Sequence, residues 1–226
     1  MKTIPFLRLI AAAGLLVTGP SVALAGDFHF RPAPVPAGEA RLMELARIRE
    51  FRGSYELGEF VQGTLLIAEL HVEGQPVKAF RLSRAKYDRA RQTRTGILSF
   101  GWHRDARHLV SVNDNGDLYS PWTAKIDLPD FAPQDAHWFA DSVPERRKAE
   151  QDWHVSFGLY PVMGLCGERS SQVNYSSVKT GEDFVKACTA AGAKSAVMIY
   201  LYKSTHDEEP SIKFAEERKP GEPAAP

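Results

Sequence analysis

The two cysteines of the chain are the residues whose type and setting point most directly to chemistry. Cys166 lies between two glycines in the stretch GLCGERSSQ (164–172), and Cys188 follows 22 positions later. A reactive thiolate needs a histidine or a helix N-terminus beside it to lower its pKa. His154, on the segment that precedes Cys166, is the histidine placed for that role. The pattern therefore leaves a small cysteine hydrolase open, although no spacing specific to such an enzyme accompanies it.

The start of the chain bears on what the cysteines do. Residues 1–25 contain Lys2 and Arg8, then an apolar stretch too short to span a bilayer, and end in Ala23-Leu24-Ala25. These features are typical of an export signal with a cleavage site. We therefore expect a mature chain that begins at Gly26 and works in the periplasm or outside the cell.

An exported protein is exposed to oxidising conditions in which disulfides persist. Two cysteines form an even set, so the sequence predicts a disulfide between Cys166 and Cys188. The loop that this bond closes would stabilise the fold by about 3 kcal/mol in the chain-entropy model. The alternative is two independent thiols, with Cys188 acting as a small buried apolar residue of a helix. No other stretch approaches the roughly 18 uncharged residues that a membrane-spanning helix needs, so no integral membrane span is expected.

A histidine pair is the second chemical feature. In GWHRDARHL (101–109), His103 and His108 flank four residues that include Asp105. If those four residues form a hairpin tip, the imidazoles are cross-strand neighbours with Cβ atoms about 5 Å apart. Such a pair can hold zinc or copper, with Asp105 as an oxygen ligand. The neighbouring arginines oppose a cation, so a metal-binding protein is the least favoured class, and no cofactor is expected.

Aromatic residues form the third feature. The proline-interrupted stretch from 117 to 142 carries Tyr119, Trp122, Trp138 and Phe139. Rings on loops above a rigid scaffold give a partner protein or a glycan a large contact area at low entropic cost. The alternative is that Trp138 and Phe139 close one end of the core, because large aromatic side chains are usually mostly buried.

The charge balance argues against two partner classes. The chain has 28 basic and 28 acidic residues, and removal of residues 1–25 takes away Lys2 and Arg8, which leaves 26 against 28, or −2. Binding to nucleic acid needs a basic surplus, so no nucleic-acid partner is expected. The arginine-rich segment 81–94 is a local exception that could bind an anion. Glu69 interrupts an apolar segment, and we expect it to face solvent or to pair with an arginine.

The elements that must position these residues are mostly strands. Apolar residues alternate in 97–103 and 153–160, as in half-buried strands, whereas 64–72 and 195–202 are apolar on both faces, as in central strands. One helix is expected: Thr180 is its N-cap, and it ends before Gly192. Residues 39–51 are ambiguous, with a strand favoured in their second half. The pattern predicts a mainly β fold, an antiparallel β-sandwich or barrel, with one C-terminal helix packed on the sheet before the last strand.

The domain organisation follows from composition. We expect a signal peptide (1–25), an extended proline-rich segment (26–39), one β-rich domain (40–203) and a disordered, charged, proline-rich tail (204–226). The favoured function is an exported, non-catalytic domain that binds a partner protein or a glycan through loops at one end. A small hydrolase and a metal-binding periplasmic protein are the alternatives.

Overall fold

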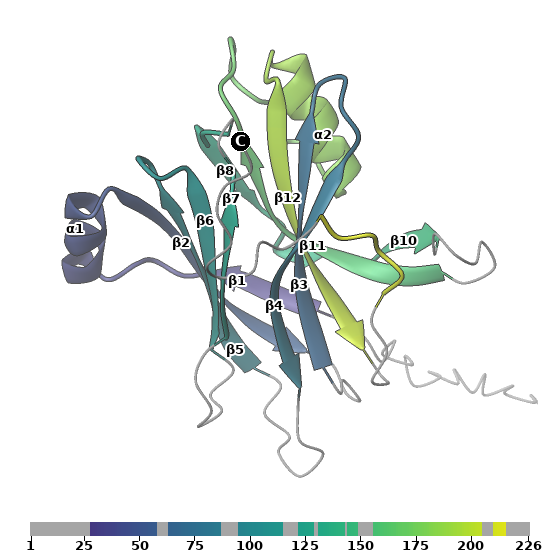
Figure 1. Cartoon of the computed structure of the whole chain (residues 1–226), viewed down its shortest axis with the longest axis horizontal. Helices are drawn as coiled ribbons and strands as arrows, with labels where there is room; N and C mark the ends of the chain where they lie inside the picture. The colour runs from purple at the N-terminus through teal and green to yellow at the C-terminus, as the bar shows by residue number, and fades with distance from the viewer. Residues whose placement is uncertain are drawn as a thin grey trace, which may run out of the picture.

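Two antiparallel β-sheets pack face to face in the structure, a computed structural model (Figure 1). It describes residues 28–57, 63–86, 95–114, 122–128, 131–142, 144–148, 156–204 and 210–215. The predicted mainly β sandwich is confirmed.

The first sheet has six strands. In spatial order they are β7 (Trp122–Asp127), β6 (His108–Asp114), β5 (Thr95–His103), β2 (Ile48–Leu57), β1 (Phe28–Pro32) and β9 (Asp141–Ser142). A helix, α1 (Ala37–Leu45), lies in the connection between β1 and β2. Both neighbours of β2 run antiparallel to it, and between β2 and β5 the chain crosses to the second sheet, where it forms β3 and β4.

The second sheet also has six strands. Five follow one another in space: β10 (Glu145–Lys148), β11 (Ser156–Cys166), β12 (Ser195–Ser204), β3 (Gly63–Val72) and β4 (Lys78–Lys86). The sixth, β8 (Asp135–Trp138), pairs with the second half of β11, while β10 pairs with its first half. The short segment from β8 to β10 therefore crosses to the first sheet at β9 and returns.

The second sheet is buried on both faces. Side chains such as Val197 and Ile199 of β12 point between the sheets into the inner core. Their alternate neighbours, such as Met198 and Tyr200, point outward into an outer core that lies beneath α2 (Gly181–Ala190). Because both faces of β12 are covered, its sequence is apolar from Ala196 to Tyr202, as expected of a central strand.

The helix α2 is the one that the sequence predicts before the last strand. The Thr180 hydroxyl accepts a hydrogen bond from the Asp183 backbone N–H, and the Asp183 carboxylate accepts one from the Thr180 N–H. This capping box satisfies two N–H groups that the helix itself cannot bond. Phe184 then packs on the sheet at Gly164, where a Cβ atom would lie only 2.6 Å from the Phe184 ring. Glycine at 164 thus sets how closely α2 approaches β11.

The N-terminal boundary of the domain differs from the expectation. Residues 26–39 were expected to lie outside it, yet β1 is an integral strand between β2 and β9. Phe30 of β1 is fully buried, and its ring occupies the space that a side chain at Gly53 would fill. The prolines that suggested an extended segment flank this strand or end it, where a missing backbone donor costs little.

Part of the C-terminal tail also packs on the domain. Residues 204–226 were expected to be disordered, but Ser204 ends β12 and Phe214 forms a parallel bridge with Ala79 of β4. Ile212 and Phe214 are partly buried against the outer core. The apolar side chains of this short segment explain the difference, since they can bury surface that its charged neighbours cannot.

Candidate functional site

The histidine pair lies where the sequence predicts, at the end of a hairpin. His103 and His108 are directly opposite in the β5–β6 register, and their rings stack with centroids 5.1 Å apart. The Ala106 N–H donates to His103 Nδ1 at 3.1 Å, which leaves the proton of a neutral ring on Nε2. Asp105 pairs with Arg47. Within the described ranges no group of three or more His, Cys, Asp or Glu side chains is placed to hold a metal.

The predicted aromatic surface is divided by the structure. Trp138 lies in β8 and stacks on Phe30 at 4.8 Å, so it belongs with the inner core. Phe139 is 5% exposed and belongs to the outer core. Neither ring is presented on an open loop, because β8 pairs with β11 and β9 pairs with β1, and this corrects the expectation of a binding surface at 138 and 139. Tyr119 and the Trp122 side chain lie outside the described residues.

The two cysteines meet in the outer core. Cys166 ends β11, Cys188 projects from α2, and both are buried. Their side chains lie 3.0 Å apart as free thiols, so the predicted meeting is confirmed while the disulfide is not formed in the structure. The hydrogen bond between them lowers the pKa of Cys166 and, with burial, raises the pKa of Cys188. A buried thiol has no surface on which to receive a substrate, and His154 lies outside the described residues.

A polar group and a ring stack border the thiols. Asp135 accepts hydrogen bonds at one carboxylate oxygen from Arg169 (3.1 Å) and from the Tyr175 hydroxyl (3.2 Å). The Tyr175 ring stacks on His137 at 4.8 Å and on Phe184 at 5.8 Å. Burial, reinforced by the charge of Asp135, raises the pKa of Tyr175, so its hydroxyl stays a donor. These contacts hold the segment after β11 against α2.

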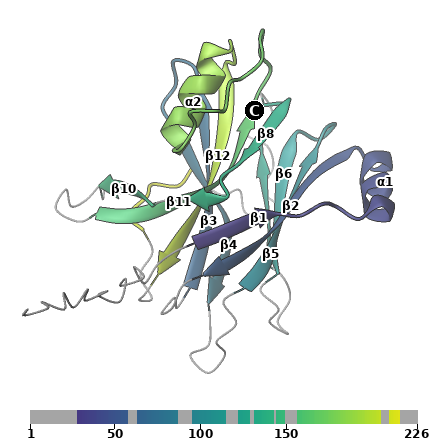
Figure 2. The ribbon, with the colours of Figure 1, turned by 180° about the vertical axis from the view of Figure 1, so that it is seen from behind.

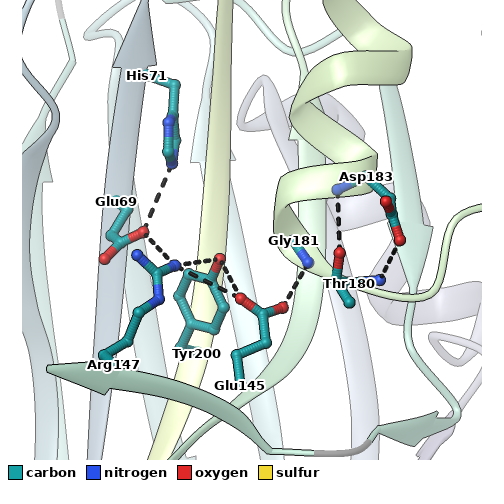
Figure 3. Close-up of polar contacts among 8 residues, drawn as sticks. All are labelled: Glu69, His71, Glu145, Arg147, Thr180, Gly181, Asp183 and Tyr200. Atoms are coloured by element: carbon teal, nitrogen blue, oxygen red, sulfur yellow. Dashed lines mark hydrogen bonds and ion pairs between the residues drawn. The ribbon is translucent and has the colours of Figure 1, made fainter.

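A second cluster of polar side chains holds the N-terminal end of α2 (Figure 3). Arg147 of β10 donates to Glu69 of β3 at 3.3 Å, to Glu145 of β10 at 3.5 Å and to the Tyr200 hydroxyl of β12 at 3.1 Å. Glu145 also accepts a hydrogen bond from the Gly181 N–H, the first amide of α2. A carboxylate at a helix N-terminus is stabilised by the helix dipole. We call Glu69, Glu145, Arg147 and Tyr200 the α2 clamp.

The clamp brings together two carboxylates that the sequence did not pair, and it confirms that Glu69 pairs with an arginine. Both carboxylates share the Arg147 guanidinium, and Glu69 is also 3.5 Å from His71 Nε2. A glycosidase needs one carboxylic acid free to donate a proton and one carboxylate facing the sugar. In the clamp three of the four carboxylate oxygens are in contact with protein groups, so the arrangement suits anchoring rather than proton transfer.

Sequence reasoning missed the feature that projects furthest from the sheets. The helix α1 stands apart from both sheets in two opposite views (Figures 1 and 2). None of its residues is buried, and Leu42 and Leu45 are 66% and 77% exposed. The only signals for this helix in the sequence were Pro36, since proline is common at the start of a helix, and apolar residues scattered around the helical wheel. Such scatter is what a helix without a core-facing side produces.

Polar contacts hold α1 at both ends. At its start, Glu39 pairs with Arg52 of β2 at 2.8 Å. Just past its end, the Arg47 carbonyl accepts a hydrogen bond from the Arg104 N–H at 3.0 Å, and the Arg47 guanidinium pairs with Asp105. The helix is thereby attached to the β5–β6 hairpin tip. It is positioned without fully burying any of its residues.

Comparison with known proteins gives no match to a family model, to a curated protein or to a solved structure. Among the helices of the described ranges, none combines the length and the apolar character that crossing a membrane requires. We therefore infer function from the geometry of the chain.

Proposed function

We propose that this protein is an exported, non-catalytic binding domain that presents α1 to a partner protein. The observation that carries the proposal is the exposure of Leu42 and Leu45 on a helix that buries none of its own residues. Helices normally gain stability by packing an apolar side on the body of the protein. A helix that is held in place yet keeps its leucines in water has an apolar surface available for association.

The spacing of the leucines suggests the mode of binding. Residues three positions apart lie on one side of a helix, so Leu42 and Leu45 form a pair of anchors for an apolar groove. The contacts at Glu39 and Arg47 order the helix in advance, which reduces the entropy lost on association. Arg41 and Arg104 are exposed beside it. We therefore infer a partner with an apolar groove and an acidic rim.

Export and a disulfide complete the proposal. Residues 1–25 have the pattern of a cleaved export signal. Cys166 and Cys188, 3.0 Å apart, need only small side-chain movements to form a disulfide in an oxidising compartment. Such a bond would attach α2 to β11 permanently. The buried thiols and the internal contacts of the clamp carboxylates support a binding role over a hydrolase.

Photo-crosslinking tests the binding surface. A benzophenone amino acid is placed at Leu45 or, as a matched control, at Thr189, an exposed residue of α2. The proposal expects one discrete adduct with a second protein from Leu45 in the cells that make the chain, none from Thr189, and loss of the adduct when Leu42→Asp is added. Because Leu42 is exposed, the thermal midpoint should stay within about 1 °C.

Other outcomes would contradict the proposal. Equal adducts at both positions would mean that α1 has no special role, and an adduct of two identical chains would identify self-association instead. The same preparations test export, since the N-terminal residue of the purified chain should be Gly26. A chain that keeps residues 1–25 would contradict export without bearing on α1.

A further inference from the structure

The C-terminal segment of residues 210–215 occupies one edge of the second sheet. In Figure 1 it is the yellow segment beside the upper part of β4, and Phe214 forms a parallel bridge with Ala79 of that strand. The Ala215 N–H donates to the Ala79 carbonyl at 2.7 Å. This contact adds a short length of a seventh strand beside β4, at the edge of the second sheet. The helix α1 belongs to the first sheet, so the two features are separate.

Side chains as well as backbone fit this edge. The Arg81 guanidinium lies 5.0 Å from the centre of the Phe214 ring, a cation–π distance. Ile212 and Phe214 pack against the outer core, and Pro210 is buried. Main-chain bonds to a strand edge combined with places for alternate side chains are the features of strand addition. The segment thus shows what kind of peptide the edge accepts.

The contact is short in comparison with the rest of the sheet. Residues 210–215 form one isolated bridge with β4, whereas β12 pairs with β3 over ten positions. In the sequence after Ser204, Ile212 and Phe214 are the only large apolar residues in a charged, proline-rich stretch. Two apolar anchors in such a stretch form a detachable ligand rather than a strand of the core.

We propose that the edge of β4 at residues 78–81 is a strand-addition site for an extended peptide segment of a partner protein, and that residues 210–215 are its built-in competitor. The partner segment runs parallel to β4 and places an aromatic ring over Arg81, as Phe214 does. Because the competitor belongs to the same chain, its binding is intramolecular, and short tethers give effective concentrations of about a millimolar. A partner segment must therefore bind tightly or arrive in a tethered form.

A labelled peptide tests the site. The probe is a fluorescent peptide with residues 208–217 (EEPSIKFAEE), and the receptor is the full-length chain with Ile212→Ser and Phe214→Ser, which detaches its own segment. Fluorescence anisotropy should show binding at least tenfold tighter to this variant than to the native chain. The peptide with Ala at the Phe214 position should lose this binding, and Arg81→Ala in the receptor should weaken it severalfold. A thermal melt confirms that each receptor is folded.

Two results would overturn the proposal. One is equal binding of the peptide to the variant and to the native chain, or equal binding of the peptides with and without the aromatic ring. The other comes from the native chain alone, by hydrogen exchange of the Ala215 amide. A detachable segment predicts exchange at least a hundredfold faster than that of the central β12 amides, so protection equal to β12 would show that the segment is a permanent strand.

Discussion

The thiol of Cys188, in the last turn of α2, lies 3.0 Å from the thiol of Cys166, at the end of β11. In the exported protein we expect this pair to be a disulfide. Thiol titration of freshly isolated, denatured and unreduced protein should then find no free thiol, and reduction should release two. Cys188→Ser should lower the free energy of unfolding by about 3 kcal/mol relative to the oxidised chain, because the closed loop is lost.

The same substitution under reducing conditions is the control for the disulfide. There it removes a sulfur from a packed site but breaks no covalent bond, so the loss should fall to about 1 kcal/mol. Two free thiols in freshly isolated exported protein would show that the pair remains reduced.

The α2 clamp gives a prediction about stability. Arg147→Met leaves the Glu69 carboxylate, with a side chain only 8% exposed, without its guanidinium. Loss of one partner of a fully buried ion pair costs about 3–5 kcal/mol. Because Arg147 is itself 38% exposed, we expect about 2 kcal/mol here. Denaturant unfolding measures this change.

The double variant and a neighbouring residue test the cause of that loss. Glu69→Met combined with Arg147→Met removes both charges and should be more stable than Arg147→Met alone, since no unpaired carboxylate remains. Arg146→Met, on the same strand but exposed, is the matched control and should change stability by less than about 0.5 kcal/mol. If Arg146→Met and Arg147→Met cost the same, the clamp does not stabilise the fold.

His137 predicts a pH dependence. Burial lowers its pKa below the ordinary value of 6.5, an effect that outweighs the opposing charge of Asp135. The unfolded chain therefore binds a proton at this ring more readily than the folded protein does. The resulting stability is present above pH 6.5 and is lost as the pH falls through the lower, folded-state pKa.

Thermal melts at pH 7.5 and pH 5.5 measure this effect. His137→Phe keeps a ring against Tyr175, which stacks on His137 at 4.8 Å, but removes the titrating group. The fall in melting temperature between the two pH values should be smaller in this variant than in the native chain. His103→Phe, in the β5–β6 hairpin, is the control. An unchanged fall in His137→Phe would assign the acid sensitivity to other groups.

Features with a local cause were predictable from the sequence. The capping box at Thr180 and the spacing of Phe184 and Cys188 define α2 without help from the rest of the chain. The turn between His103 and His108 likewise aligns two strands that are adjacent in sequence. Hydrogen bonds and side-chain periodicity within about ten residues determine such features. The mainly β class and the place of the helix could therefore be predicted from the sequence pattern.

The roles of individual side chains were decided by contacts between distant segments. Phe30 fell in the extended segment expected outside the domain, because nothing near it in sequence shows that Gly53 leaves a space for its ring. Trp138 and Phe139 have the composition of a binding loop and become core residues because their segment crosses between the two sheets. The α2 clamp draws Glu69, Arg147 and Tyr200 from three strands.

The sequence by itself therefore determined the central strands, the one packed helix and a pair of cysteines able to meet. Only the tertiary structure decided which surfaces are covered. It packs the predicted aromatic rings at 138 and 139 against the two cores, leaves Leu42 and Leu45 of α1 in water, and lays Phe214 on the edge of β4. The physical reason is that burial depends on which distant element packs against a residue, and a single sequence records the side chain but not its neighbour.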